Sequence, residues 1–137
     1  MTSHKITIET TIAAPVERVW NAYTTPVDIT QWNFASDDWC CPGAEVEVEV
    51  GGNYRARMEA KDGSVGFDFE AVFEEVVPRE VVTLAMSDGR KARTTFEAAD
   101  GGTKVTTVFD AETQNPLEMQ RDGWQAILNN LRSYLEG

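Results

Sequence analysis

The sequence predicts an α+β fold in which a curved antiparallel sheet of six to seven strands packs against one long C-terminal helix, with two short helices after the first strand. Residues 115–136 place apolar side chains at helical spacing over about 20 residues, or roughly 30 Å of helix. Residues 45–109 instead alternate apolar and polar side chains between short Gly-rich turns, which is typical of antiparallel strands. Because a helix cannot bury its own apolar stripe, the sheet must supply the covering surface.

Size and charge narrow the classes of function. The 137 residues, 42% of them hydrophobic, are predicted to form one domain spanning residues 1–137. The net charge of −11 opposes binding to nucleic acid or to an anionic membrane, because both need a basic surface. No apolar stretch has the length of a membrane span, and the N-terminus alternates apolar and polar residues rather than forming a signal peptide. We expect a cytoplasmic protein, monomeric or homodimeric.

The N-terminal third is predicted to contain one strand and two helices. Residues 5–12 carry isoleucines at period two, which indicates a strand with one buried face. Pro15 suits a first helical turn, and an amphipathic helix of about two turns follows it. Thr25 can cap a second, short helix with Pro26 in its first turn, and Trp32 is assigned to this helix.

Residues 33–44 are predicted to be a loop that is unusually rich in aromatic side chains. Phe34 and Trp39 lie within it, and Trp32 directly precedes it. Since loops are normally polar and exposed, such a loop either folds back on the core or forms the wall of a cavity. The sequence leaves both alternatives open.

The two cysteines, Cys40 and Cys41, are adjacent in the sequence. A disulfide between neighbours is strained and closes no useful loop, so reduced structural thiols are the simplest interpretation. A redox switch or a soft-metal site is the functional alternative. The one histidine, His4, is too remote to complete a zinc site, so we expect no metal.

Six strands are predicted between residue 45 and residue 109, joined by turns at Gly51-Gly52, Asp62-Gly63, residues 87–89 and residues 100–102. Their predicted ranges are 45–50, 54–58, 65–73, 81–86, 92–98 and 104–109.

The C-terminal helix has a start signal and one unusual residue. Asn115 can cap it, Pro116 fits its first turn, and Glu118 lies near its positive end. Gly123 costs about 1 kcal/mol relative to Ala inside a helix, so a close strand or a ligand is expected beside it, next to Trp124.

Three stretches together resemble a known family. The opening ITIETTIAAPVERVWNAYTTPVDITQW resembles the N-terminus of START-like (SRPBCC superfamily) proteins. EVEVEVGGNYRARME resembles the Gly-Gly-x-Tyr-x-x-x-Met strand pair of the branch related to the activator of heat-shock-protein-90 ATPase, and GWQAILNNLRSYLE resembles its C-terminal helix. The three occur in the family's order, and the match runs from about residue 5 to residue 136.

The resemblance implies a helix-grip fold, in which an antiparallel sheet wraps around the long helix with a cavity between them. Many superfamily members bind hydrophobic small molecules there, and some are cyclases, hydrolases or dehydratases. The co-chaperone member uses this domain beside a second one, for which we expect no room in this chain.

The predicted binding site combines inward-facing strand residues with the middle of the helix. Ordinary core packing of the same side chains is the alternative. The hydroxyl of Tyr54, Thr94, Thr107 and Gln120 are candidate polar groups in such a pocket, whereas Arg55, Arg57 and Arg93 are assigned to the solvated face. The predicted ligand-binding residues are Trp32, Phe34, Trp39, Tyr54, Met58, Phe67, Phe69, Leu84, Met86, Phe96, Gln120, Gly123, Trp124 and Ile127.

Catalysis has weaker support in the sequence. There is no Ser–His–Asp set, no Cys–His pair and no phosphate-binding loop. Asp37 and Asp38 are the best acidic candidates, with an exposed turn as the alternative. We therefore predict a non-catalytic domain without cofactor that binds a small apolar or amphipathic molecule. The alternatives are a protein-interaction or co-chaperone-like module acting on a stress-response chaperone, and a cyclase- or hydrolase-like enzyme.

Overall fold

The computed structural model describes residues 4–136 and contains one curled antiparallel sheet and three helices in that range. The sheet order is β1-β7-β6-β5-β4-β3-β2, so every neighbouring pair is antiparallel and only β1 joins out of sequence. This confirms the predicted α+β class and the helix-grip arrangement. The elements are β1 (Lys5–Ile12), α1 (Val16–Thr24), α2 (Pro26–Ile29), β2 (Trp39–Val46), β3 (Asn53–Ala60), β4 (Gly66–Val77), β5 (Val81–Met86), β6 (Lys91–Ala99), β7 (Gly102–Asp110) and α3 (Leu117–Glu136).

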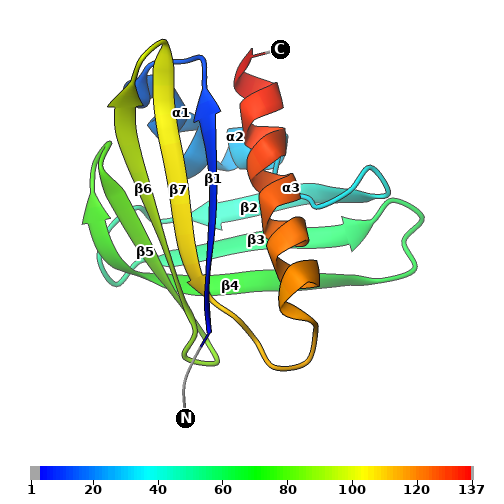
Figure 1. Cartoon of the computed structure of the whole chain (residues 1–137). Coiled ribbons are helices and arrows are strands. Elements are labelled where there is room, and N and C mark those ends of the chain that lie inside the picture. The colour runs from blue at the N-terminus through cyan, green and yellow to red at the C-terminus, as the bar shows by residue number, and fades with distance from the viewer. Residues whose placement is uncertain (1–3, 137) are drawn as a thin grey trace.

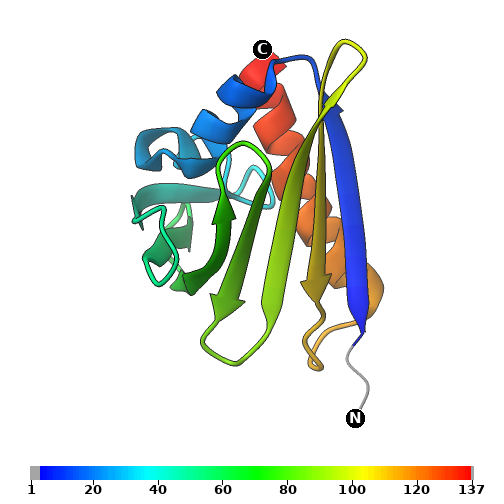
Figure 2. The same ribbon diagram turned by 90° about the vertical axis from the view of Figure 1, so that its left-hand side faces the viewer.

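The sheet bends around α3. Strands β1, β7, β6 and β5 run alongside the helix, whereas β2, β3 and β4 cross behind it at a steep angle (Figure 1). The register between β4 and β5 shifts between Phe73 and Glu75, a bulge at the place where the sheet changes direction. Figure 2 shows α3 behind the face formed by β1, β7, β6 and β5, with α1 and α2 covering the end where α3 finishes.

The core lies between the concave face of the sheet and the three helices. Its largest fully buried side chains are Phe109, Ile12, Ile29, Leu131 and Val19. Each such side chain contributes roughly 1.5–3 kcal/mol by burial. On the opposite face, the three arginines predicted to be solvated form ion pairs, Arg55 with Glu45, Arg57 with Asp68 and Arg93 with Glu75, so that prediction is confirmed.

The turn at Gly51-Gly52 depends on both glycines. Gly51 has a φ of +87°, which side chains disfavour. A Cβ on Gly52 would lie 2.2 Å from the carbonyl oxygen of Glu47, so the chain can approach itself this closely only without a side chain.

The structure corrects the prediction for residues 33–50. Strand β2 begins at Trp39, inside the predicted loop, and ends at Val46, so the predicted strand 45–50 is wrong beyond that residue. Val48 and Val50 are exposed, because the chain turns there to reach β3. Pro42 is tolerated in β2 because this is an edge strand, and the pairing shifts register between Cys40 and Gly43.

Two helix boundaries also differ from the prediction. Helix α2 ends at Ile29, so Trp32 lies beyond it and donates its indole N–H to the carbonyl oxygen of Ala22 at 3.0 Å. Helix α3 begins at Leu117, one residue after Pro116, which was predicted to lie in its first turn behind an Asn115 cap. No helix within residues 4–136 has the length and apolarity needed to cross a bilayer.

Candidate functional site

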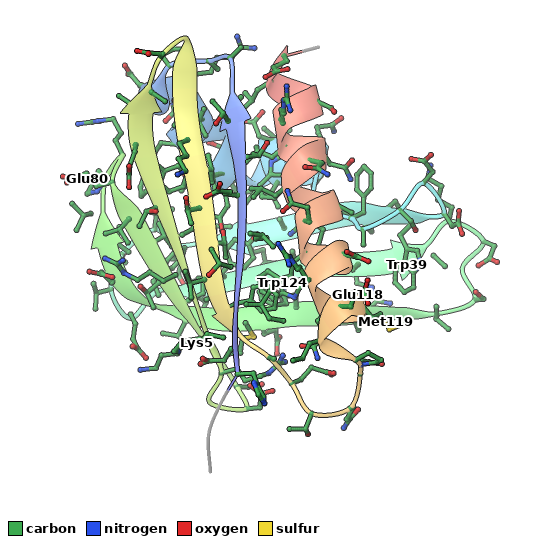
Figure 3. All side chains as sticks on the ribbon, in the orientation of Figure 1. Lys5, Trp39, Glu80, Glu118, Met119 and Trp124 are labelled. Atoms are coloured by element: carbon green, nitrogen blue, oxygen red, sulfur yellow. The ribbon has the colours of Figure 1, made fainter. Side chains whose placement is uncertain are left out.

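A cavity of about 400 Å³ lies between α3 and the concave face of the sheet. This volume falls within the range of about 300–1,000 Å³ typical of small-molecule sites. The side chain of Trp124 points from α3 toward the strands on this side of the helix (Figure 3). The helix contributes one face to the wall, comprising Met119, Gln120, Gly123, Trp124, Ile127 and Leu128.

Most of the predicted binding residues line this cavity. They come from the segment after α2, from β3, β4 and β5, and from the middle of α3. This agrees with the predicted combination of inward-facing strand residues and the centre of the helix. The predicted residues in the wall are Trp32, Tyr54, Met58, Phe67, Phe69, Leu84, Met86, Gln120, Gly123, Trp124 and Ile127.

Phe96 is not part of the wall. It is 4% exposed and packs edge-on between Trp20 and Tyr23, with ring centroids 5.4 and 5.3 Å apart, because α1 covers this part of β6. It is therefore a core residue, and its assignment to the wall is corrected.

Two aromatic residues of the predicted loop also lie outside the wall. Phe34 packs against the core, and its carbonyl oxygen accepts a hydrogen bond of 2.6 Å from Asn130. Trp39 starts β2 beside α3, away from Trp124 (Figure 3), and contacts Phe67 with ring centroids 6.1 Å apart. Because Trp39 is the first residue of β2 and not part of a loop, it lies at the outer end of the sheet.

Aromatic rings in mutual contact build the inner wall. Tyr54 meets Phe69 and Phe73 edge-on, with centroids 5.9 and 6.2 Å apart. Phe69 in turn meets Trp124 edge-on at 6.3 Å. Edge-on contacts of this kind add to the stability gained from burial, so the wall is a fixed surface rather than a set of independent side chains.

The polar groups of the interior are hydroxyls and one amide. The Tyr54 hydroxyl accepts a hydrogen bond of 3.2 Å from Asn33 Nδ2. The hydroxyl of Tyr23 is hydrogen-bonded to that of Thr94, with the oxygens 3.1 Å apart, and the hydroxyl of Thr94 is hydrogen-bonded to that of Thr107, with the oxygens 2.7 Å apart. Burial raises the pKa of Tyr54 well above its ordinary value, and burial also raises the pKa of Tyr23. Both phenols are therefore uncharged at neutral pH.

Gln120 lines the cavity but is not the free polar group that the sequence predicted. Its Oε1 accepts the backbone N–H of Glu112 at 2.9 Å. Its Nε2 donates to the carbonyl oxygens of Glu112 and Asn115 at 3.1 and 2.9 Å. Gln120 thus fastens the β7–α3 loop to the first turns of the helix.

Comparison with known proteins identifies the relatives of this structure. The model of the Activator of Hsp90 ATPase homolog 1-like protein family matches residues 13–136. The chain belongs to this family. A comparison with curated proteins finds no match.

Solved structures of similar proteins have the same fold as this family member. The AHSA1-like protein from Aeromonas hydrophila is 43% identical with a TM-score of 0.92, and the alignment covers 97% of this chain and 92% of that one. A protein from Cytophaga hutchinsonii is 41% identical with a TM-score of 0.82, covering 95% and 90%. A protein from Chromobacterium violaceum, at 23% identity and a TM-score of 0.85 over 98% and 99%, shares the fold. The resemblance to START-like proteins is confirmed at the level of family and fold.

In this family member two charged side chains, Arg90 and Glu112, also reach the wall of the cavity. Arg90 Nε donates to Asp88 Oδ2 at 2.6 Å. Glu112 Oε1 accepts the backbone N–H of Asn115 at 2.7 Å. Both charges are therefore engaged in ordering the loops from which they come.

Sequence reasoning missed several wall residues for identifiable reasons. Arg90 follows the turn after β5 and Glu112 lies at the start of the β7–α3 loop, and the sequence does not specify the three-dimensional path of either segment. Met119 lies one helical turn before Gly123 and was detectable from that spacing. Thr107, predicted as a polar group of the pocket, is in the wall; the wall residues that were not predicted are Ile8, Tyr23, Asn33, Ala35, Arg90, Ala92, Glu112, Asn115, Met119 and Leu128.

The other candidates from the sequence lie away from the cavity. Asp37 and Asp38 are exposed. Cys40 Sγ and Cys41 Sγ contact different carbonyl oxygens, those of Glu59 and Gly43, at 3.6 and 3.5 Å. Burial raises the pKa of the Cys41 thiol, which lowers its reactivity. Within residues 4–136 no group of three or more His, Cys, Asp or Glu side chains is placed to hold a metal ion.

A second hollow, of about 630 Å³, involves strands β2 to β5 and is lined largely by polar and charged side chains, among them Glu45, Glu47, Arg55 and Glu70. Because these four charged side chains belong to its lining, it suits an apolar organic ligand less well than the cavity beneath α3.

Proposed function

We propose that this protein binds a small apolar or amphipathic molecule in the cavity beneath α3 and does not act on it chemically. The observation that carries the proposal is the open space above Gly123. A Cβ built on this residue meets no atom within 4 Å, although Gly123 faces the cavity from the middle of a helix. A close strand therefore does not explain the glycine, and space kept for a ligand does.

The chemistry of the wall supports binding rather than catalysis. A general acid or base works best with a pKa near the operating pH. The phenols of Tyr23 and Tyr54 have pKa values raised above their usual range, which removes them from that role at neutral pH. Glu112 is engaged at the start of the β7–α3 loop, where it accepts the N–H of Asn115.

The test is capture of a ligand followed by titration. Purified protein is incubated with an extract of lipids and metabolites, and native mass spectrometry identifies what stays bound. The captured compound is then titrated while tryptophan fluorescence is recorded. We expect saturable binding whose fluorescence response is reduced in Trp124→Phe, and the absence of both a bound species and a fluorescence response would contradict the proposal.

A second candidate, a co-chaperone-like module, is supported by the outer end of β2 to β4. Trp39 packs on Phe67 there, and Phe67 and Val65 are 49% and 56% exposed. Exposed apolar side chains gathered in one place are typical of protein contacts, and the family is named after an activator of the Hsp90 ATPase. Activation of a purified Hsp90-class ATPase by the wild type, reduced in Trp39→Ala, would support it. Ligand titration of the same variant should be unchanged.

A further inference from the structure

Three hydroxyl groups form a hydrogen-bonded chain behind the cavity wall, from α1 through β6 to β7. The oxygens of Tyr23 and Thr94 are 3.1 Å apart, and those of Thr94 and Thr107 are 2.7 Å apart. Thr94, in the middle, is 1% exposed and lies outside the wall, whereas Tyr23 and Thr107 both belong to it. The chain therefore reaches the cavity at both ends.

Counting protons shows that this chain has one donor left over. Each hydroxyl has a single proton to donate, so three hydroxyls supply three protons for two hydrogen bonds. If both ends donated to Thr94, its own buried proton would have no acceptor within residues 4–136, at a cost of about 1–3 kcal/mol. The bonds therefore run in one direction along the chain. The remaining proton belongs to Tyr23 or Thr107, which are both residues of the cavity wall.

Tyr54 places a second donor on the same wall. Its oxygen accepts a hydrogen bond from Asn33 Nδ2, which leaves its own proton available. Phe69, Leu84 and Met86 of the same wall are apolar. The hydroxyls of this wall thus offer hydrogen-bond donors that carry no charge.

We infer that the ligand carries an uncharged hydrogen-bond acceptor, such as the oxygen of a ketone, ester or amide, on an otherwise apolar body. The inference rests on the proposed function and names the class of ligand for the same cavity. The acceptor oxygen binds the hydroxyl donors, while the apolar body lies against Trp124 and Phe69. An anionic ligand is disfavoured, because Arg90 of the wall is already paired with Asp88 and Glu112 adds a negative charge to the same wall, and burying a charge without a free partner cation is costly.

The test uses three fluorescent probes built on one dimethylaminonaphthalene ring, carrying a propionyl group, a propyl group or a carboxylate. We expect the ketone to bind roughly two- to tenfold more tightly than the propyl probe, the range expected for one net hydrogen bond, and more tightly than the carboxylate. In the double variant Tyr23→Phe, Thr107→Val the ratio between ketone and propyl probe should fall toward one. The control double variant Tyr134→Phe, Thr106→Val makes the same chemical changes outside the cavity wall and should keep the ratio.

The outcomes separate this inference from the proposed function. Equal affinity of the wild type for the ketone and the propyl probe overturns the inference and leaves the proposed function standing. Tightest binding of the carboxylate overturns the uncharged character of the acceptor. Binding of none of the three overturns the proposed function, and the inference with it. The comparison of probes on the wild type decides these outcomes even if the double variant fails to fold, and Tyr54→Phe then provides the matching single change.

Discussion

The indole of Trp124 lies nearly parallel to the ring of Phe109, with centroids 4.1 Å apart and planes inclined by 12°. The same indole meets Phe69 edge-on. Phe109 belongs to β7 and Phe69 to β4, so one side chain of α3 contacts strands on both sides of the bend in the sheet. Trp124 thereby fixes the distance between the helix and the two parts of the sheet.

Replacing Phe109 by alanine should destabilise the protein strongly. Phe109 is 1% exposed, so Phe109→Ala leaves a cavity beneath Trp124 and should lower the free energy of unfolding by about 3–5 kcal/mol. Denaturant unfolding measures the change. The matched control Phe67→Ala changes the same side chain where it is 49% exposed and should cost much less. Equal losses in the two variants would contradict the role given to the Trp124–Phe109 contact.

Enlarging Gly123 should separate folding from binding. Gly123→Ala should raise the free energy of unfolding by about 1 kcal/mol, because alanine favours the helix and its Cβ meets no atom within 4 Å. Gly123→Leu should remain folded and lose ligand affinity, because the larger side chain fills the space that faces the cavity. Thermal unfolding and titration with the propionyl probe measure the two effects. If Gly123→Leu unfolds, this glycine is a packing residue and does not keep space for a ligand.

Removing the amide of Gln120 should release the β7–α3 loop. Gln120→Met keeps the length of the side chain but leaves the N–H of Glu112 and the carbonyl oxygens of Glu112 and Asn115 without their partner. We expect a loss of about 1–3 kcal/mol and faster hydrogen exchange at the amide of Glu112. Gln125→Met, which removes the bonds to the carbonyl oxygen of Glu9 and to Asn129 Oδ1, is the control and should leave exchange at Glu112 unchanged.

The ion pair of Asp110 should make the free energy of unfolding depend on pH in the acid range. Lys5 Nζ lies 2.6 Å from its carboxylate, and this hydrogen bond, followed by that from the backbone N–H of Lys91, lowers the pKa of Asp110 below its ordinary value. Because the pKa of Asp110 is lowered in the folded state, its carboxylate contributes fully to the free energy of unfolding at pH values above its unfolded-state pKa of about 4. This contribution is lost as the pH falls through the pKa of the folded state.

Asp110→Asn should therefore be less stable than the wild type at neutral pH, and the difference should narrow as the pH falls below about 4. Urea unfolding across a pH series measures it. Asp122→Asn removes the same charge from an exposed position on α3 and provides the comparison. A difference for Asp110→Asn that stays constant with pH would show that the ion pair is not its cause.

The sequence predicts the sheet, the long helix and much of the cavity wall because these depend on local patterns. Alternation of apolar residues identifies the inward face of each strand, which is why Tyr54, Met58 and Phe69 were placed correctly. The helical period likewise places Gly123 and Trp124 on the side of α3 that meets the sheet. In both cases the periodicity of the sequence matches the structure, because each strand and the helix bury one face.

What the sequence did not predict depends on pairing and on loop paths. Pro42 and Gly43 indicate a loop, yet β2 pairs with β3 through this segment because an edge strand accommodates both residues at an irregular register. Gln120 was predicted to be available to a ligand, but its amide is hydrogen-bonded to the backbone of Glu112 in the β7–α3 loop. The path of this loop does not follow from the periodicity of the sequence.

The sheet remains open between its two edge strands, β1 and β2, and α3 lies inside its curve (Figure 1). Side chains hold the helix in place, as in the stacking of Trp124 on Phe109 and the bond from Gln125 to the carbonyl oxygen of Glu9. Widening a closed barrel requires breaking ladder hydrogen bonds, whereas a shift of this helix would break side-chain contacts such as these and leave the ladders intact. The width of the cavity is therefore set by the side chains of α3 and not by the pairing of the strands.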